Sequence, residues 1–310
     1  MKKIIFDTDI GIDDAFGVAY AVKHFDVVGI TTVFGNCTVS QATKNAKLFA
    51  DRLGLDIKKV YRGASKPLLG ESIKPATEIH GVDGLGDVLE NNFDDQASDA
   101  VSFIIDTIRK NPGEITIVAV GPYTNLAIAL ILAPDIADKI KEVVVMGGAF
   151  GTDEIKGNVT PFAENNIYSD SHAADLVFNA SWNVTVIPLD VTHKIALTRK
   201  EIESTRNSDL IAISDVYLKF YMDAVNFDGM IVHDALTISY IKNPELFHCE
   251  NKEIRVSLEG ITLGQTLTSI SDVGFMENPF NSSPKNRVCL GVDVEKVKVN
   301  LIDSLSNKKR

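Results

Sequence analysis

Four aspartates follow the first apolar segment of the chain within eight residues. The segment Ile4–Phe6 leads directly into Asp7, Asp9, Asp13 and Asp14. Capping of a following helix would use one or two acidic side chains, but four so close together repel one another unless a cation lies among them. Carboxylate oxygens are hard ligands that favour Ca²⁺ or Mg²⁺ over zinc. The cluster therefore predicts a site for a hard divalent cation.

Two kinds of metal chemistry fit a strand that ends in aspartates. A strand followed by DxDx[TV] opens the haloacid-dehalogenase-type phosphatases, in which the first aspartate is the nucleophile and Mg²⁺ the cofactor. This chain has Gly11 where those enzymes have Thr or Val, and it lacks a convincing later lysine and acidic pair. These differences disfavour a Mg²⁺-dependent phosphatase.

A set of short sequence motifs favours a glycosidase instead. The segment Asp7–Ala15 reads DTDIGIDDA and resembles the DxDxGxDDA signature of the inosine–uridine-preferring nucleoside hydrolase family. The resemblance continues through Thr31–Asn36, Val120–Asn125, Val145–Gly148, Ala163–Asn166 and Val232–Ala235. Each block is weak alone, but their combination and order across residues 4–235 are specific.

This resemblance implies a calcium site and a catalytic base. Asp9, Asp14, Asp234 and the backbone carbonyl of Val120 would bind Ca²⁺, with Asp7 orienting its neighbours. The family often has Thr at the Val120 position, but a main-chain ligand makes that departure unimportant. Asp9 would also activate water for attack on the ribose.

The substrate contacts also follow from the resemblance. The ribose hydroxyls would be held by Asp13, Asn36, Asn158, Glu164 and Asn166. N-glycosidic cleavage builds positive charge on the ribose ring, which a carboxylate-rich pocket stabilises. The loop positions among these residues could otherwise be ordinary polar loop residues.

The base side of the pocket has two histidine candidates. His233 lies next to Asp234, and with a pKa near 6.5 it could protonate the departing base at neutral pH. His80 is the second candidate. Tyr217 and Tyr221 are one helical turn apart and resemble an aromatic base-binding pair, although core packing is the alternative.

The predicted reaction is hydrolysis of a ribonucleoside to ribose and free base. His233 and the two tyrosines favour the broad inosine–uridine type over the purine-specific type, which relies on tryptophans. Trp182 is the only tryptophan and precedes a predicted core strand, so we expect a structural role for it. A non-catalytic nucleoside- or ribose-binding module is a further alternative, which the intact Asp9 and His233 disfavour.

Composition limits the possible partners and the compartment. The 310 residues have a net charge of −11, which disfavours nucleic acid. The longest clear apolar stretch, Leu126–Ala133, is far too short for a membrane span. Cys37, Cys249 and Cys289 are far apart without a CxxC pair, which fits a reducing cytosol. We expect a soluble, cytoplasmic protein, and the resemblance implies a homodimer or homotetramer.

The elements that must position these residues alternate along the chain. Buried strands are predicted at Lys3–Phe6, Val27–Val33, Ile115–Val120, Glu142–Met146 and Val184–Pro188. Helices are predicted at Asp13–Val22, Ser40–Leu53, Ala100–Lys110, Asn125–Ala133 and Ser169–Phe178. This alternation predicts an α/β fold with an open, mainly parallel sheet flanked by helices.

The rest of the chain completes the predicted domain. Residues Arg199–Ile241 look largely helical, and short strands from Phe247 onward precede a last helix near Val294–Leu305. No linker marks a boundary, so we expect one domain over residues 1–310. The long loops Gly63–Gly86 and Phe150–Ile167 follow predicted strands, and we expect both to overhang the carboxyl edge of the sheet, where ligands bind in such folds.

Overall fold

The structure is a computed structural model that describes residues 1–269 and 278–306. Its main feature is a ten-stranded sheet in the order β11-β10-β12-β7-β6-β5-β1-β2-β3-β4. The strands are β1 (Lys3–Thr8), β2 (Asp26–Thr32), β3 (Val60–Arg62), β4 (Ser98–Asp99), β5 (Ile115–Ala119), β6 (Glu142–Met146), β7 (Val184–Ile187), β10 (Phe247–Val256), β11 (Thr266–Thr268) and β12 (Lys285–Val292). A separate antiparallel pair joins β8 (Ala196–Thr198) to β9 (Gly229–Ile231).

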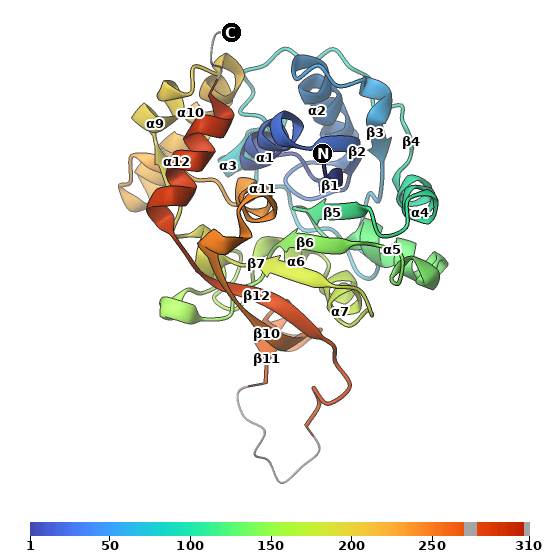
Figure 1. The fold of residues 1–310 in the computed structure, drawn as a ribbon. Coiled ribbons are helices and arrows are strands. Elements are labelled where there is room, and N and C mark those ends of the chain that lie inside the picture. The colour runs from blue at the N-terminus through green and yellow to red at the C-terminus, as the bar shows by residue number, and fades with distance from the viewer. Residues whose placement is uncertain (270–277, 307–310) are drawn as a thin grey trace.

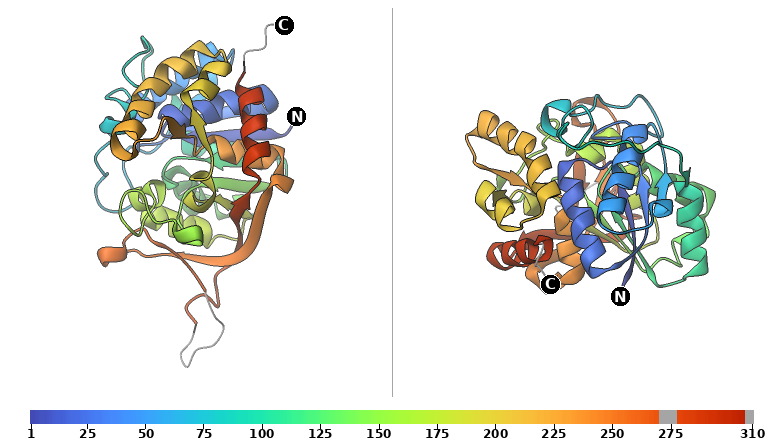
Figure 2. Two further views of the ribbon diagram at one scale, coloured as in Figure 1. Left: turned by 90° about the vertical axis from the view of Figure 1, so that its left-hand side faces the viewer. Right: turned by 90° about the horizontal axis from the view of Figure 1, so that it is seen from above.

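Twelve α-helices accompany the strands in the described residues. They are α1 (Ile12–His24), α2 (Val39–Arg52), α3 (Thr77–His80), α4 (Ala100–Lys110), α5 (Thr124–Leu132), α6 (Asn165–Ser169), α7 (Ser171–Phe178), α8 (Leu189–Thr192), α9 (Arg199–Ser204), α10 (Ser208–Val225), α11 (Ala235–Lys242) and α12 (Val294–Leu305). Figure 1 shows α1, α11 and α12 on one side of the sheet and α4, α5 and α7 on the other. In the view from above in Figure 2, α12 and α4 likewise lie on opposite sides.

Successive side chains of the central strands point to opposite faces of the sheet. In β1, Ile4 and Phe6 belong to the apolar cluster that includes α1 and α11, whereas Ile5 belongs to the cluster that includes α4, α5 and α7. The strands are therefore buried on both faces, which explains their continuous apolar runs. The predicted α/β fold with a mainly parallel sheet is confirmed.

The differences from the predicted elements have local causes. The helix predicted at Ser169–Phe178 is α7, which begins at Ser171, and a separate short helix, α6, ends at Ser169. The Asp170 carboxylate accepts hydrogen bonds from Ala173 N, Thr124 Oγ1 and Leu68 N, so it caps α7 and ties the break to neighbouring segments. The helical region after Arg199 is interrupted by β9. The three-residue or shorter strands β3, β4 and β8 leave too little pattern to predict.

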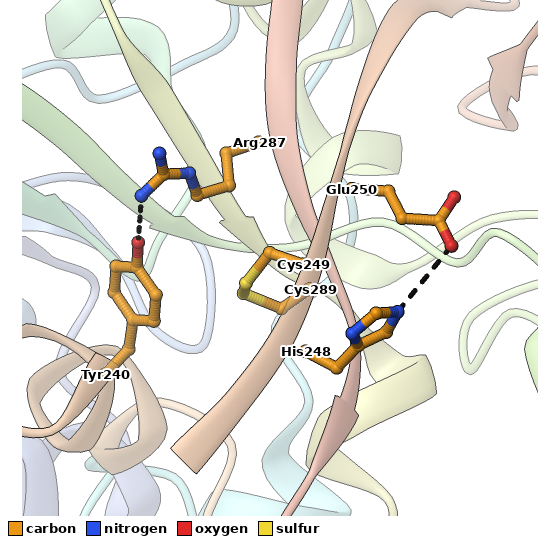
Figure 3. The surroundings of a disulfide bond; sticks show 6 residues. All are labelled: Tyr240, His248, Cys249, Glu250, Arg287 and Cys289. Atoms are coloured by element: carbon orange, nitrogen blue, oxygen red, sulfur yellow. Dashed lines mark hydrogen bonds and ion pairs between the residues drawn. A yellow bond between two sulfur atoms is a disulfide. The ribbon is translucent and has the colours of Figure 1, made fainter. Parts of the chain in front are cut away.

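Two of the three cysteines are paired in the structure, whereas their wide spacing without a CxxC pair fitted a reducing cytosol. Cys249 on β10 and Cys289 on β12 face each other across the antiparallel pair and form a disulfide (Figure 3). On the same strand β12, Arg287 donates to the Tyr240 hydroxyl at 3.2 Å. Cys37 is buried and free. The register of a strand pair, which spacing does not reveal, brings Cys249 and Cys289 together.

Candidate active site

A cavity of about 740 Å³ opens at the carboxyl edge of the central strands. It lies there because β1, β5 and β6 are parallel neighbours, so the segments after Thr8, Ala119 and Met146 meet at one edge. The cavity wall contains the predicted residues Asp13, Asn36, His80, Val120, Asn158, Glu164, Asn166, Tyr217, Tyr221, His233 and Asp234. Parts of both long loops also line it, as expected.

Three carboxylates converge beside this cavity, and two of them, Asp13 and Asp234, line it. Asp13 and Asp14 begin α1, Asp234 precedes α11, and one oxygen from each lies within 4.8 Å of the others. All three are buried. Burial and mutual repulsion raise the pKa of Asp13 and Asp234 well above the ordinary value. Such a group of oxygens fits a hard divalent cation, whose charge would offset the repulsion.

Asp9 and Asp14 do not line the cavity and are fully buried. The Asp9 Oδ2 atom accepts from Asn36 N at 2.6 Å, while Oδ1 has no hydrogen-bond partner among the described residues. The approach to the loop is so close that a Cβ on Gly35 would lie 1.9 Å from Oδ2. Burial and the nearby Asp14 raise the pKa of Asp9 well above the ordinary value. A metal ion or a water molecule could bind to this unpartnered oxygen.

The other aspartates of the first cluster are held by hydrogen bonds. Asp7 accepts from the Thr31 hydroxyl and from Asn125 Nδ2, the latter at 2.8 Å. Burial raises the pKa of Asp7 to about 6. Asp14 accepts from Thr8 and from Gly11 N. Asp7 does not line the cavity, and its role in orienting the neighbouring ligands stays a prediction.

Two histidines, His80 and His233, also line the cavity. His80 Nδ1 accepts a hydrogen bond from Ile12 N at 3.1 Å. A backbone amide can only donate, so the His80 ring is neutral and has its hydrogen on Nε2; burial lowers its pKa to about 4. His233 Nδ1 lies 2.7 Å from Thr192 Oγ1.

The surroundings of His233 alter its expected acidity. Burial, assisted by His193 and His80, lowers the pKa of His233 well below the ordinary value. The expectation of a pKa near 6.5 is therefore wrong, because the sequence did not reveal how completely the ring is enclosed.

The tyrosines of α10 lie beside these histidines. The ring centroids of Tyr217 and Tyr221 are 5.1 Å apart, and that of Tyr217 is 5.4 Å from His80. Both tyrosines line the cavity, although Tyr217 also packs against the apolar core. Tyr217 thus packs in the core and also lines the cavity, and its contact with the base stays a prediction.

The loop after β6 supplies the remaining polar wall. Glu164 caps α6 by accepting from Asn166 N and Ile167 N, and it also accepts from Gly148 N. Asn166 Nδ2 donates to the Val120 carbonyl at 2.8 Å. A carbonyl oxygen has two lone pairs, so the Val120 oxygen retains one for another ligand.

Comparison with known proteins identifies the family. The family model described as inosine-uridine preferring nucleoside hydrolase matches residues 4–299. The chain belongs to this nucleoside hydrolase family. A curated relative, the inosine-uridine preferring nucleoside hydrolase of Crithidia fasciculata, is 35% identical over 98% of this chain and 97% of its own length. The probable uridine nucleosidase 2 of Oryza sativa subsp. japonica is 36% identical over 96% of this chain and 90% of its own.

Solved structures agree with the family assignment. A plant nucleoside hydrolase has a TM-score of 0.91 at 34% identity and covers 99% of both chains. A purine-preferring ribonucleoside hydrolase from Gardnerella vaginalis has a TM-score of 0.88 at 34% identity and covers 98% of both. The chain is therefore a nucleoside hydrolase that acts on ribonucleosides, an enzyme of the N-glycosyl hydrolase class. The family assignment decides between the glycosidase and phosphatase interpretations.

Sequence reasoning missed three residues of this nucleoside hydrolase site, all on or next to α8. Asp190 is buried and accepts from Phe150 N at 2.8 Å and Thr152 N at 2.6 Å. Thr192 contacts His233, and His193 lines the cavity with its ring 5.6 Å from that of His233. A four-residue helix after a strand has no periodicity that would draw attention to it.

Two further expectations concern residues and segments outside the site. Trp182 is buried and donates to the Val177 carbonyl at 2.8 Å, which confirms its structural role. Within residues 1–269 and 278–306, no helix of the nucleoside hydrolase is both long and apolar enough to span a membrane.

Proposed function

We propose that this nucleoside hydrolase uses Ca²⁺ to cleave the N-glycosidic bond of inosine, uridine and related ribonucleosides, giving ribose and free base. The observation that supports this most strongly is that one cavity is lined by two kinds of chemical group. The carboxylates of Asp13 and Asp234 and the rings of His80, His233 and Tyr217 all line it. Cleavage places positive charge on the ribose and negative charge on the departing base, so the cavity contains groups suited to each charge. Such an activity serves nucleoside catabolism and salvage.

Asp9, Asp14, Asp234 and the Val120 carbonyl are the proposed Ca²⁺ ligands. The fit rests on the buried oxygens of the carboxylate group, the unpartnered Asp9 Oδ1 and the free lone pair of the Val120 oxygen. Oxygen-only ligands suit calcium. When bound, the ion would lower the pKa of a water molecule and orient ribose hydroxyls.

Asp9 is the proposed catalytic base. Its Oδ1 atom has no hydrogen-bond partner among the described residues, so its lone pairs are available to a water molecule. The proton comes from the water that attacks the anomeric carbon of ribose as the bond to the base breaks. Asp13 is the carboxylate to compare with Asp9 as proton acceptor, because Asp13 lines the cavity and Asp9 does not.

The remaining polar wall would hold the ribose. Asn36 donates from its backbone to Asp9 and from its side chain to Asp14 at 3.1 Å. A ribose held by Asn36 would therefore be placed relative to Asp9, the proposed catalytic base. Fixing the sugar in this way converts binding energy into orientation of the reacting atoms. The assigned ribose contacts are Asp13, Asn36, Asn158, Glu164 and Asn166.

His233 is the proposed proton donor to the departing base. Once protonated, an imidazole of lowered pKa is a stronger acid than free histidine. His80 presents its Nε2 hydrogen to the base, and Tyr217 and Tyr221 provide aromatic contact area.

The decisive experiment measures reducing-sugar release from a panel of ribonucleosides in buffer without phosphate. The protein is treated with EDTA, then supplied with Ca²⁺ or, in parallel, Mg²⁺. We expect ribose release that EDTA abolishes and Ca²⁺ restores. Release that persists after EDTA would contradict the metal role, and no release in any condition would favour a nucleoside-binding module.

We further propose a cytoplasmic homodimer or homotetramer with a small-molecule ribonucleoside as its partner and neither nucleic acid nor membrane. Light scattering measures the assembly, and a monomer mass would contradict it. The Cys249–Cys289 disulfide is more typical of oxidising compartments. Trapping of free thiols with a maleimide in intact cells tests the compartment: three reactive cysteines in denatured protein are expected in the cytoplasm, and one would contradict this location.

A further inference from the structure

Thr192 approaches the proposed proton donor from behind the cavity. It is the last residue of α8, is fully buried and does not line the cavity, whereas His233 does. Its Oγ1 lies 2.7 Å from His233 Nδ1. Because Nδ1 is engaged with a residue outside the cavity, Nε2 is the ring nitrogen left for a ligand.

The hydroxyl hydrogen of Thr192 determines which nitrogen of His233 bears a hydrogen. Other buried threonines, Thr43 and Thr237 in helices and Thr205 directly after α9, donate to backbone carbonyls. Among the described residues, the Thr192 hydroxyl has only His233 Nδ1 as a partner. A buried hydroxyl left without an acceptor is costly, so its hydrogen points at Nδ1, and Nδ1 accepts.

We propose that Thr192 is a positioning residue that fixes the His233 ring through Nδ1, so that Nε2 and its hydrogen face the leaving base. This inference rests on the proposed role of His233. The Thr192 hydroxyl donates to Nδ1 of the neutral ring; in the protonated ring that gives its Nε2 hydrogen to the base, Nδ1 also bears a hydrogen and the Thr192 oxygen accepts from it. Thr192 thus acts on the leaving group through His233 and touches no substrate atom.

The effect should depend on how much help the leaving group needs. Thr192→Val keeps the shape of the side chain and removes the hydroxyl. We expect a 10- to 100-fold lower kcat on uridine and inosine, in the range of a general acid contribution, with KM changed less than threefold. Turnover of p-nitrophenyl riboside, whose leaving group needs little protonation, should stay within about threefold. Thr192→Ser, which retains a hydroxyl, should recover most of the nucleoside activity.

The matched control is Thr205→Val, which removes another buried hydroxyl at the end of a helix, one bonded to the Ile202 carbonyl. This variant should have unchanged kcat and KM on nucleosides and on p-nitrophenyl riboside. In ¹⁵N-histidine-labelled protein, the ring nitrogen signals of His233 should report a hydrogen on Nε2 in the parent and a mixture of tautomers in Thr192→Val.

The outcomes separate this inference from the proposed function. Equal losses on nucleosides and on p-nitrophenyl riboside would indicate a structural role for Thr192 and overturn the inference, as would an unaffected Thr192→Val enzyme. His233→Ala is measured in parallel. If His233→Ala loses nucleoside activity while Thr192→Val does not, only the inference fails; if His233→Ala retains it, the proton-donor role itself fails.

Discussion

The amide of Ile12 donates a hydrogen bond to Nδ1 of His80 across 68 residues of sequence, at 3.1 Å. Ile12 opens α1, and its two successors are the buried aspartates Asp13 and Asp14. One hydrogen bond therefore links the start of the carboxylate-bearing helix to the histidine wall of the cavity. It also requires His80 to be neutral, because a protonated ring could not accept it.

His80 should make the folded protein sensitive to acid. Its pKa is about 4 in the folded protein and 6.5 as the ordinary value, so below pH 6.5 the unfolded chain binds a proton that the folded chain does not. The contribution of neutral His80 to the free energy of unfolding is fully present above pH 6.5. It is lost as the pH falls towards 4, and the loss is at most about 3 kcal/mol. Urea unfolding between pH 7.5 and 4 should show a smaller loss of stability in His80→Asn than in the parent. Parallel curves for the two proteins would contradict the assignment.

Asp190 should control substrate affinity through the loop that follows β6. Its carboxylate accepts two backbone hydrogen bonds, from Phe150 and Thr152, and Asp190→Asn replaces one acceptor with a donor. We expect a free energy of unfolding lower by about 1–3 kcal/mol. Because this loop continues into Asn158 and Glu164, KM should rise about tenfold with a smaller change in kcat.

The matched control for Asp190 is Asp175→Asn. Asp175 also accepts from a backbone amide, that of Val256, and pairs with Arg255, but the segment it holds is β10 instead of the loop after β6. The Asp175→Asn variant should have a lower free energy of unfolding and an unchanged KM. Steady-state kinetics and urea unfolding of both variants check this, and an equal rise of KM in both would argue against a specific effect of the loop.

Asp9 and Asp13 should respond differently to removal of charge. Asp9→Asn should lower kcat about 10²- to 10⁴-fold, since the base is lost, whereas Asp13→Asn should act mainly on KM. Each apo variant should unfold at a higher temperature than the parent, because one buried, repelled carboxylate is removed. Kinetics at saturating uridine and thermal unfolding in EDTA measure the two effects. If Asp13→Asn shows the larger kcat loss, the proton acceptor is Asp13.

The Cys249–Cys289 disulfide should stabilise the edge of the sheet without assisting catalysis. It joins residues 40 apart in sequence, and closing a loop of that size contributes up to about 4 kcal/mol by restricting the unfolded chain. Reduction should lower the unfolding midpoint and leave activity at 25 °C unchanged. Cys249→Ser should behave like the reduced parent and be insensitive to reductant. A reductant effect of equal size in Cys249→Ser would exclude the disulfide as the cause.

The order of elements and most of the site were predictable from local pattern. Continuous apolar strands such as Glu142–Met146 and periodic helices such as Ala100–Lys110 are present at the predicted boundaries, because burial on both faces or on one face leaves a direct mark on residue type. The aspartates at the end of β1 and the start of α1 indicated a charged site, since helix capping does not explain four carboxylates so close together.

Only the tertiary structure decided how the side chains are protonated and paired. The lowered pKa of His233, its contact with Thr192 and the two bonds of Asp190 arise from packing between segments distant in sequence. The Cys249–Cys289 pair depends on strand register. Residue types and spacing encode local conformation and burial, whereas desolvation and hydrogen-bond partners are properties of three-dimensional surroundings.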